Sequence, residues 1–171
     1  MAKNETMRRS VDENAEAAEH LASGLADGLA AHGWTVATAE SLTGGTIASV
    51  LSAAPEASTW FRGSIVAYSP EVKFGLLGVP RGPVVTETCA TRMASRTAEL
   101  LGAEVSVAVT GVGGPEPDEG QPPGSVWFAV VSPAGTHTEK VTFEGDPPAV
   151  LAATSEHAIT LLHRVARGEL P

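Results

Sequence analysis

The sequence predicts a single α/β domain in which helices cover both faces of one mixed sheet, a three-layer α/β/α architecture. Its 171 residues, 43% of them hydrophobic, suffice for one globular domain with a buried core. Helical patterns alternate with short apolar segments along almost the whole chain, which is typical of a sheet flanked by helices. A hairpin late in the chain adds antiparallel strands, so we expect a mixed sheet.

The first half of the chain opens with a polar segment. Residues 1–12 are expected to form a flexible N-terminus, and residues 13–171 the domain. Apolar residues recur at helical spacing from about residue 15 and predict a helix that stops at Gly33. The later elements expected in this half are a strand over 34–39, a helix over 46–52, a strand over 64–68 and a short helical stretch over 71–77.

The second half contains the longest regular patterns. Gly102 follows a helical repeat and predicts where that helix ends. The segment 110–124 is dense in glycine and proline, so it is expected to be a loop, and long loops in compact domains are often functional. The regular elements expected here are a helix over 87–101, strands over 105–109, 125–131 and 136–143, and a closing helix over 149–166.

The chain is acidic. Lysine and arginine total 11 against 20 aspartates and glutamates, a formal net charge of −9. Such a surface repels phosphate backbones and anionic membranes, so we expect neither nucleic acid nor a membrane as a partner. A pocket can still supply local N–H groups to a small anion. The charge is therefore compatible with a small-molecule substrate.

The cysteine content, the apolar segments and the histidine spacing each argue against one kind of protein or site: a disulfide-linked domain, an exported or membrane protein, and a metal site. Cys89 is the only cysteine, so no intrachain disulfide forms, and we expect a small buried side chain rather than a nucleophile. No apolar stretch is long enough for a signal peptide or a membrane span, which predicts a cytoplasmic protein. The five histidines form no metal-binding motif, so we expect no metal site.

A polar turn, TAESLTGG at residues 38–45, lies between the first predicted strand and the following helix. A hydroxyl-rich turn of this kind, with glycines and a helix start behind it, directs N–H groups toward whatever binds there. Serine and threonine also cap helices and glycine eases tight turns, so a structural role is the alternative. The candidate site residues in the turn are Glu40, Ser41, Thr43, Gly44 and Gly45.

Tyr68 and Lys73 lie at the end of the second predicted strand and just beyond it, where both could face one crevice. A lysine near a serine hydroxyl can accept its proton if burial lowers the ammonium pKa, and Tyr68 could relay that proton. The alternative is a solvated lysine and a half-buried tyrosine. Ser69, one helical turn before Lys73, is a second candidate nucleophile on a turn less suited to oxyanion donors.

The glycine-rich loop begins TGVGGP at residues 110–115. It is not a dinucleotide fingerprint, because Glu116 replaces the last glycine, and the chain contains no Gly-Lys-Ser/Thr. What remains is a flexible loop whose backbone can approach a ligand closely, with turn formation alone as the alternative. The candidate contacts are Thr110, Gly111 and Gly113.

Taken together, these segments resemble the CinA carboxy-terminal domain family over about residues 14–165. The resemblance implies a nicotinamide-nucleotide amidohydrolase, which converts nicotinamide mononucleotide to nicotinic acid mononucleotide and ammonia in pyridine nucleotide salvage. The chain resembles the stand-alone form, without a molybdopterin-binding-like N-terminal domain. The segments that carry the resemblance are AESLTGG at 39–45, WFRG at 60–63, YS at 68–69 with Lys73, TG at 110–111, GP at 114–115 and PGSVWF at 123–128.

Position by position, the resemblance implies Ser41 as the nucleophile on the carboxamide carbon and Lys73 as its general base. Tyr68 would be a supporting hydroxyl near both, and Thr110 and Ser58 would line the site. These roles agree with the chemistry inferred from the residue types alone.

The resemblance also implies the remaining parts of the mechanism. Hydrolysis would proceed through an acyl-enzyme, and backbone N–H groups at residues 43–45 would stabilise the oxyanion. No metal or cofactor would be required. A homo-oligomer is expected, with a dimer favoured.

The chain departs from the family pattern near the expected phosphate position. Pro147 and Leu151 stand where relatives usually carry arginines, and Arg62, Arg81 or a neighbouring subunit could replace them. This difference motivates two alternatives: a catalytically impaired relative that binds a nucleotide-like ligand or a protein partner, and an amidase for another small amide. Further departures are Leu42 for a cysteine, Pro70 for an asparagine and Gln121 near a lysine.

Overall fold

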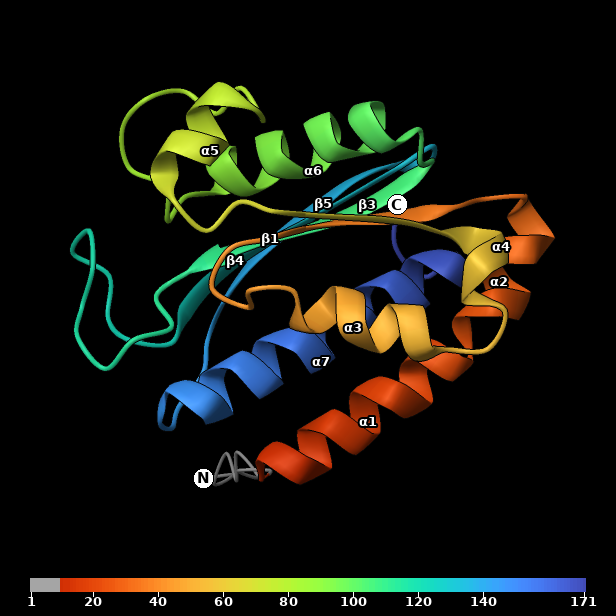
Figure 1. Ribbon diagram of the computed structural model, residues 1–171, viewed down its shortest axis with the longest axis horizontal. Coiled ribbons are helices and arrows are strands. Elements are labelled where there is room, and N and C mark those ends of the chain that lie inside the picture. Colours follow the sequence, from red (N-terminus) through yellow and green to blue (C-terminus); the bar gives the residue numbers. More distant parts are fainter. Residues whose placement is uncertain (1–9) are drawn as a thin grey trace, which may run out of the picture.

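The computed structural model describes residues 10–171 and confirms the expected α/β class (Figure 1). The strands are β1 (Val36–Glu40), β2 (Phe61–Val66), β3 (Val105–Gly111), β4 (Ser125–Ser132) and β5 (Gly135–Thr142). They form one sheet in the order β2-β1-β3-β4-β5. β1 is parallel to β2 and β3, whereas β4 is antiparallel to β3 and β5, so the sheet is mixed as expected.

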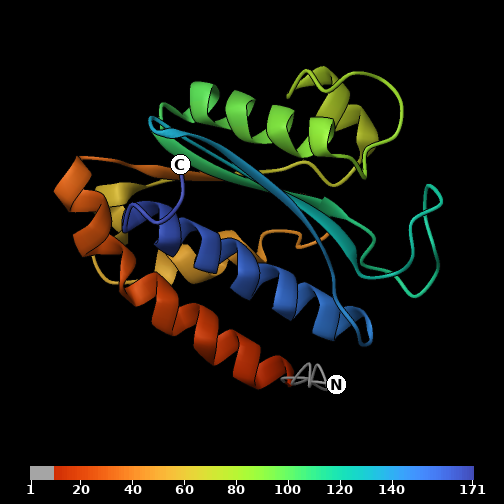
Figure 2. The same ribbon diagram turned by 180° about the vertical axis from the view of Figure 1, so that it is seen from behind.

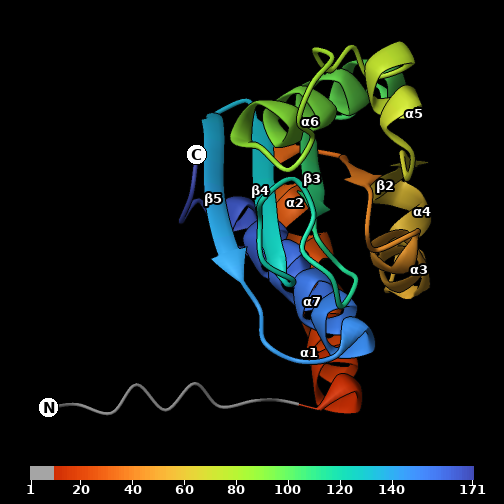
Figure 3. The ribbon, with the colours of Figure 1, turned by 90° about the vertical axis from the view of Figure 1, so that its left-hand side faces the viewer.

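Helices cover both faces of the sheet, which completes the three layers (Figure 3). The helices are α1 (Val11–Ser23), α2 (Leu25–His32), α3 (Thr46–Ala53), α4 (Ala57–Trp60), α5 (Pro70–Gly75), α6 (Glu87–Leu101) and α7 (Pro147–Ala166). α5 and α6 lie on one face, and α3 and α7 on the other. α1 packs along the outside of α7 (Figure 2).

Each face of the sheet has its own core, because successive side chains of a strand point to opposite faces. Val107 and Val109 of β3 join the core on the α7 side. Ala108, between them, joins the core on the α6 side together with Cys89, which is 1% exposed and buried as expected. Thr110 follows this alternation and therefore lies on the α6 side.

The first helices differ from the expectation in two ways. Ser10 caps α1 through a capping box, in which its Oγ accepts from Glu13 N and its own N donates to the Glu13 carboxylate. Residues 10–12, assigned from the sequence to the flexible N-terminus, therefore begin the first helix, and residues 1–9 lie outside the described part. Gly24 separates α1 from α2 where one helix was expected, and a Cβ there would lie 3.0 Å from His163 Nε2, so close packing against α7 accounts for the glycine.

The second strand also differs from the expectation. It occupies residues 61–66 rather than 64–68, and the short helix α4 directly precedes it. Four residues are too few to show a helical repeat, so α4 could not be recognised from periodicity. The remaining strands and the long helix α6 lie within a few residues of the expected positions.

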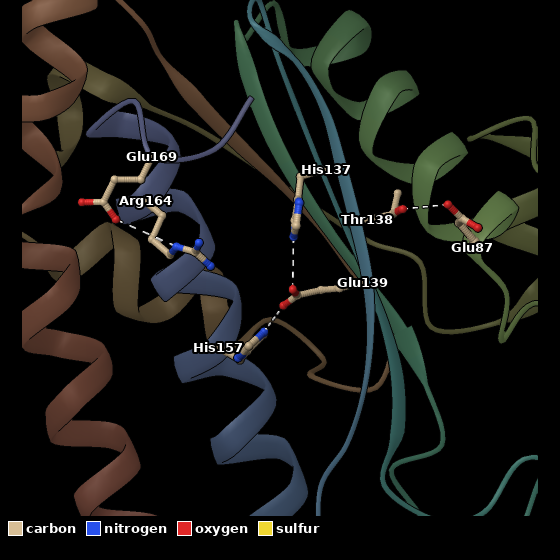
Figure 4. A network of polar contacts seen from close by, with 7 residues as sticks. All are labelled: Glu87, His137, Thr138, Glu139, His157, Arg164 and Glu169. Atoms are coloured by element: carbon tan, nitrogen blue, oxygen red, sulfur yellow. Dashed lines mark hydrogen bonds and ion pairs between the residues drawn. The ribbon is translucent and has the colours of Figure 1, made fainter.

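The edge strand β5 is tied to both helical layers by polar contacts (Figure 4). Glu139 lies between His137 on its own strand and His157 on α7, with His137 Nε2 at 3.1 Å from Glu139 Oε2. On the opposite face, Thr138 Oγ1 donates to Glu87 of α6 at 2.7 Å. Within residues 10–171, no group of three or more histidine, cysteine, aspartate or glutamate side chains is arranged to hold a metal ion. No helix in this part of the chain is long and apolar enough to cross a bilayer.

Candidate active site

Ser41 and Thr110 both lie at the carboxyl ends of neighbouring parallel strands. β1 and β3 pair from Val36 with Val105 to Ala39 with Ala108. Ser41 directly follows β1, and Thr110 lies near the end of β3, so both hydroxyl residues belong to the same edge of the sheet. This edge is where open α/β sheets usually bind ligands.

Glu40 builds the turn that carries Ser41. Its side chain is fully buried, and its carboxylate accepts from the backbone N–H groups of Gly45 (3.1 Å), Ile47 (3.0 Å) and Ala48 (2.9 Å). Ser64 Oγ adds a fourth hydrogen bond at 3.2 Å. Its oxygens are therefore engaged in fixing the start of α3, and a substrate contact by Glu40 stays a prediction.

Gly44 and Gly45 shape the turn and are not oxyanion donors. Their φ values of +56° and +106° lie in the left-handed region, which glycine adopts at low cost. Gly44 N donates to Ser41 O at 3.1 Å, and Gly45 N donates to Glu40. Both N–H groups expected to face an acyl oxyanion are thus already engaged within the turn.

Thr43 carries the unused polar groups of this turn. It is 2% exposed, and its Oγ1 has no hydrogen-bond partner among residues 10–171. The same holds for the buried hydroxyls of Thr38, Thr97, Ser106 and Ser125 within the described residues, so this feature alone does not identify a ligand site. The backbone N–H groups of Leu42 and Thr43 also have no acceptor within the described residues, which makes them the available oxyanion donors.

Lys73 is the largest polar side chain that the fold buries. Only 2% of it is exposed, which excludes the alternative of a solvated surface lysine. Its Nζ donates to Tyr68 O at 3.3 Å. Burial lowers the pKa of the Lys73 ammonium below its usual value, although Cys89 and Glu119 act in the opposite direction. A lysine with a lowered pKa is suited to act as a general base near neutral pH.

Tyr68 and Ser69 lie outside this buried group. The Tyr68 side chain is 70% exposed, and Tyr68 reaches Lys73 through its carbonyl oxygen. Ser69 is exposed and caps α5, with its Oγ accepting from Val72 N at 3.4 Å. The geometry therefore gives neither hydroxyl a contact with the Lys73 amine.

Thr110 and Cys89 complete the buried polar cluster on the α6 side of the sheet. Thr110 is 1% exposed, and its Oγ1 donates to Val84 O at 2.8 Å. Burial raises the pKa of the Cys89 thiol, although a hydrogen bond with the Thr110 side chain and the charge of Lys73 lower it. Lys73, Cys89 and Thr110 thus lie together, and Thr110 belongs to the strand that neighbours the one preceding Ser41.

Glu119, which closes this cluster on the loop side, was not predicted from the sequence. Its carboxylate accepts from the backbone N–H groups of Val84 (2.8 Å) and Val85 (2.7 Å). Its φ of +48° is unusual for a residue with a side chain. A glutamate in a Gly/Pro-rich loop forms no recognisable sequence motif when its hydrogen-bond partners are backbone groups more than thirty residues away in the chain.

The two loop glycines have different roles. A Cβ at Gly111 would lie 2.4 Å from Ser125 O, so close packing against β4 explains this glycine and no ligand contact is required. A Cβ at Gly113 would lie 3.2 Å from Leu42 Cβ and 3.8 Å from Leu151 Cδ1. Gly113 therefore brings the loop against the Ser41 turn, and Leu151 borders the same place.

Two other expected residues lie at the opposite end of the sheet. Ser58 is exposed on α4, before β2 begins, whereas Ser41 follows the carboxyl end of the parallel strand β1. Within one chain, Ser58 is therefore not brought together with Ser41, and its role in the site stays a prediction. Arg62 Nε donates to Thr35 Oγ1 just before β1, so Arg62 is also too distant to anchor a phosphate in the site.

Arg81 remains as a cation near the site. It lies on the link after α5, forms two hydrogen bonds with Glu71 at 3.2 and 3.1 Å, and stacks over the Phe74 ring at 5.2 Å. The N-terminus of α7 does not attract an anion comparably, because the Asp146 carboxylate already caps it: Asp146 Oδ1 accepts from Ala149 N. An anionic substrate would have to compete with Glu71 for Arg81.

Comparisons with known proteins agree with this architecture. The sequence model of the CinA C-terminal domain matches residues 18–166. A CinA-like protein from Frankia casuarinae is 40% identical over 139 residues, which are 78% of this chain and 32% of that protein. The chain thus spans about a third of that relative's length.

Shorter relatives match over nearly their whole length. Protein YdeJ of Escherichia coli is 37% identical over 150 residues, which cover 84% of this chain and 87% of that protein. The crystal structure of a Competence-Damaged Protein (CinA) superfamily protein from Klebsiella pneumoniae superimposes with a TM-score of 0.84 at 32% identity, covering 88% of this chain and 98% of that one. The chain therefore belongs to the CinA C-terminal domain family.

Proposed function

We propose that this protein is an amidohydrolase that releases ammonia from the carboxamide of nicotinamide mononucleotide through a Ser41–Lys73 mechanism. The observation that carries the proposal is the burial of Lys73, whose lowered pKa suits a general base. Membership in the CinA family and the position of Ser41 directly after the parallel strand β1 support it.

In the proposed reaction, the neutral amine of Lys73 takes the proton of Ser41 Oγ as the oxygen attacks the carboxamide carbon. The N–H groups of Leu42 and Thr43 stabilise the oxyanion. The C–N bond then breaks, and the Lys73 ammonium protonates the leaving ammonia. Water, deprotonated by Lys73, attacks the acyl-enzyme and releases nicotinic acid mononucleotide and free Ser41. The residues alone account for this sequence without a cofactor.

The test is ammonia release from nicotinamide mononucleotide by the purified protein, compared with its Ser41→Ala and Lys73→Ala variants. Both variants should lose activity by a factor on the order of 10³ or more. Ser58→Ala, at the opposite end of the sheet, is the matched control and should remain active. Loss of activity in Ser69→Ala with retention in Ser41→Ala would transfer the nucleophile to Ser69 and refute this assignment.

A second candidate function is favoured by the apolar border of the site. Leu42 and Leu151 both lie against Gly113, and Pro147 begins the acid-capped helix α7, so this border contributes no cation for a phosphate. The protein could then hydrolyse another small amide, or bind a nucleotide-like ligand or a protein partner without turnover. Ligand binding without ammonia release, unchanged in Ser41→Ala, would establish the binding role.

We further propose that the protein acts as a homodimer. β2 is an edge strand, and the exposed side chains of Val66, Tyr68, Val72 and Leu76 lie on or beside it and on α5. Such apolar residues beside an unpaired strand are suited to self-association. Light scattering should show that Leu76→Glu dissociates the dimer, whereas Leu100→Glu, on α6 and also exposed, does not. A monomeric parent would exclude the proposal.

A further inference from the structure

The loop between β3 and β4 is hydrogen-bonded to the segment before α6 through the side chain of Glu119. Glu119 holds two successive backbone N–H groups, with Val84 N at 2.8 Å from Oε1 and Val85 N at 2.7 Å from Oε2. Val84 N also lies 2.9 Å from Oε2. Val84 and Val85 are themselves nearly buried, so these N–H groups would otherwise lack a partner.

Glu119 adopts an unusual backbone conformation to make this contact. Its φ is +48°, and the only other residue besides glycine with a positive φ within residues 10–171 is Glu56. Residues held in sparsely populated backbone conformations persist only where surrounding contacts impose them, and they cluster at functional sites. The neighbouring backbone bonds between Asp118 and Gln121, at 3.1 and 2.8 Å, close the turn that presents Glu119.

Val84 connects Glu119 with Thr110. While Val84 N donates to Glu119, Val84 O accepts from Thr110 Oγ1 at 2.8 Å. The Thr110 hydroxyl proton is therefore committed to Val84, and the lone pairs of that oxygen are left for its neighbours. These neighbours include Cys89, which in turn lies close enough to Lys73 for the two to influence each other's ionisation.

We propose that Glu119 is a positioning residue of the active site: it fastens the β3–β4 loop and, through Val84, fixes the Thr110 hydroxyl beside Lys73. Its carboxylate is also the nearby negative charge that balances the Lys73 ammonium when that group holds the proton taken from Ser41. The inference rests on the proposed Ser41–Lys73 function for its kinetic consequences. The loop contact and the fixed position of the Thr110 hydroxyl do not depend on that function.

The negative charge of Glu119 affects the pKa of Lys73 in one definite direction. The titratable groups that act on Lys73 within the described residues are Cys89 from α6 and Glu119 from the loop. Removing the negative charge of Glu119 disfavours the ammonium form, so Lys73 should lose its proton at lower pH. If Lys73 is the general base, the acidic limb of the kcat/KM profile should move to lower pH by the same amount.

The experiment compares the parent protein with Glu119→Gln and with Asp118→Asn. Asp118 is the adjacent residue and loses the same charge, but among the described residues it contributes only backbone hydrogen bonds. Hydrogen exchange at the Val84 and Val85 amides reports the loop contact. The ¹³Cε chemical shift of Lys73 reports its protonation, and it is easily assigned because the chain has three lysines. The pH dependence of kcat and KM for ammonia release reports the catalytic consequence.

Glu119→Gln should make both amides exchange at least about tenfold faster, the change expected from weakening one charge-assisted hydrogen bond. The midpoint of Lys73 and the acidic limb should shift together to lower pH, and kcat should fall more than KM changes. Asp118→Asn should leave the exchange rates unchanged and shift the midpoint less.

Two results would overturn the proposal. Unchanged amide exchange in Glu119→Gln would show that the loop contact does not depend on the carboxylate. Faster exchange with an unshifted Lys73 midpoint would reduce Glu119 to a structural residue. A parent that releases no ammonia would instead refute the proposed function, while the exchange and titration data would still decide the role of Glu119.

Discussion

The two faces of the sheet are packed in opposite ways. The core on the α7 side is built from large apolar side chains such as Leu25, Leu29 and Phe128, all at most 1% exposed. The core on the α6 side consists largely of alanines and small residues, and it buries Lys73 and Thr110 next to them. Burying an amine costs stability, which a purely structural core would avoid. The buried amine on the α6 side is therefore consistent with the role proposed for Lys73, whereas the large apolar side chains of the α7 side serve stability.

The largest expected effect tests whether Lys73 is buried for chemistry. Lys73→Met should lower ammonia release by a factor on the order of 10³ or more, because the variant lacks the proposed general base. The same substitution should raise the free energy of unfolding by about 1 kcal/mol, since it removes the cost of a buried amine. Denaturant unfolding and the ammonia assay together measure both changes. A destabilised variant would contradict the division between the two faces.

The next effect probes the opposite face. Phe128 packs against Phe143 and His157 with ring centroids 6.1 and 4.7 Å away, and it is fully buried. Phe128→Ala should cost about 3–5 kcal/mol of unfolding free energy because of the cavity it leaves. Phe74→Ala, at a half-buried position on the α6 side, is the control and should cost clearly less. Equal losses of unfolding free energy in the two variants would contradict the conclusion that the two cores differ in their contribution to stability.

A smaller effect is expected where the two faces meet, at the turn after β1. Glu40→Gln replaces a carboxylate that accepts four hydrogen bonds and should cost about 1–3 kcal/mol. Activity should fall as well, because the turn that holds Ser41 loosens. Ser64→Ala removes one of the four bonds and should cost less than Glu40→Gln. Thermal unfolding of both variants would reveal whether Glu40 is dispensable.

The smallest effect concerns the polar network on β5. Hydrogen bonds from His157 and His137 lower the pKa of Glu139 below its usual 4.5, outweighing the opposite effect of burial. Because the folded pKa is lowered, this stabilisation is present above pH 4.5 and is lost as the pH falls below it. Glu139→Gln should remove about 1 kcal/mol at pH 7 and flatten the pH dependence of stability below pH 5. An unchanged profile in unfolding experiments would show that the network adds no stability.

The elements with strong local patterns were predictable. Gly102 marked the end of α6, and the apolar run at 105–109 indicated the central strand β3. Ser41, Lys73 and Thr110 could also be selected, because a serine after a strand, a nearby lysine and a glycine-rich loop combine into a recognisable pattern. Gly24 and α4 were missed, since the contact with His163 and a four-residue helix leave no periodic signal.

The sequence by itself determined the fold class, the family and the residue types available at the strand ends, because these depend on local periodicity and on segments read in order. Only the tertiary structure decided which polar groups are already occupied. Glu40 is engaged by the start of α3, Tyr68 is exposed, and Ser58 lies at the far end of the sheet. Glu119 became visible for the same reason. Burial and hydrogen-bond partners depend on segments distant in the chain, which a linear pattern does not contain.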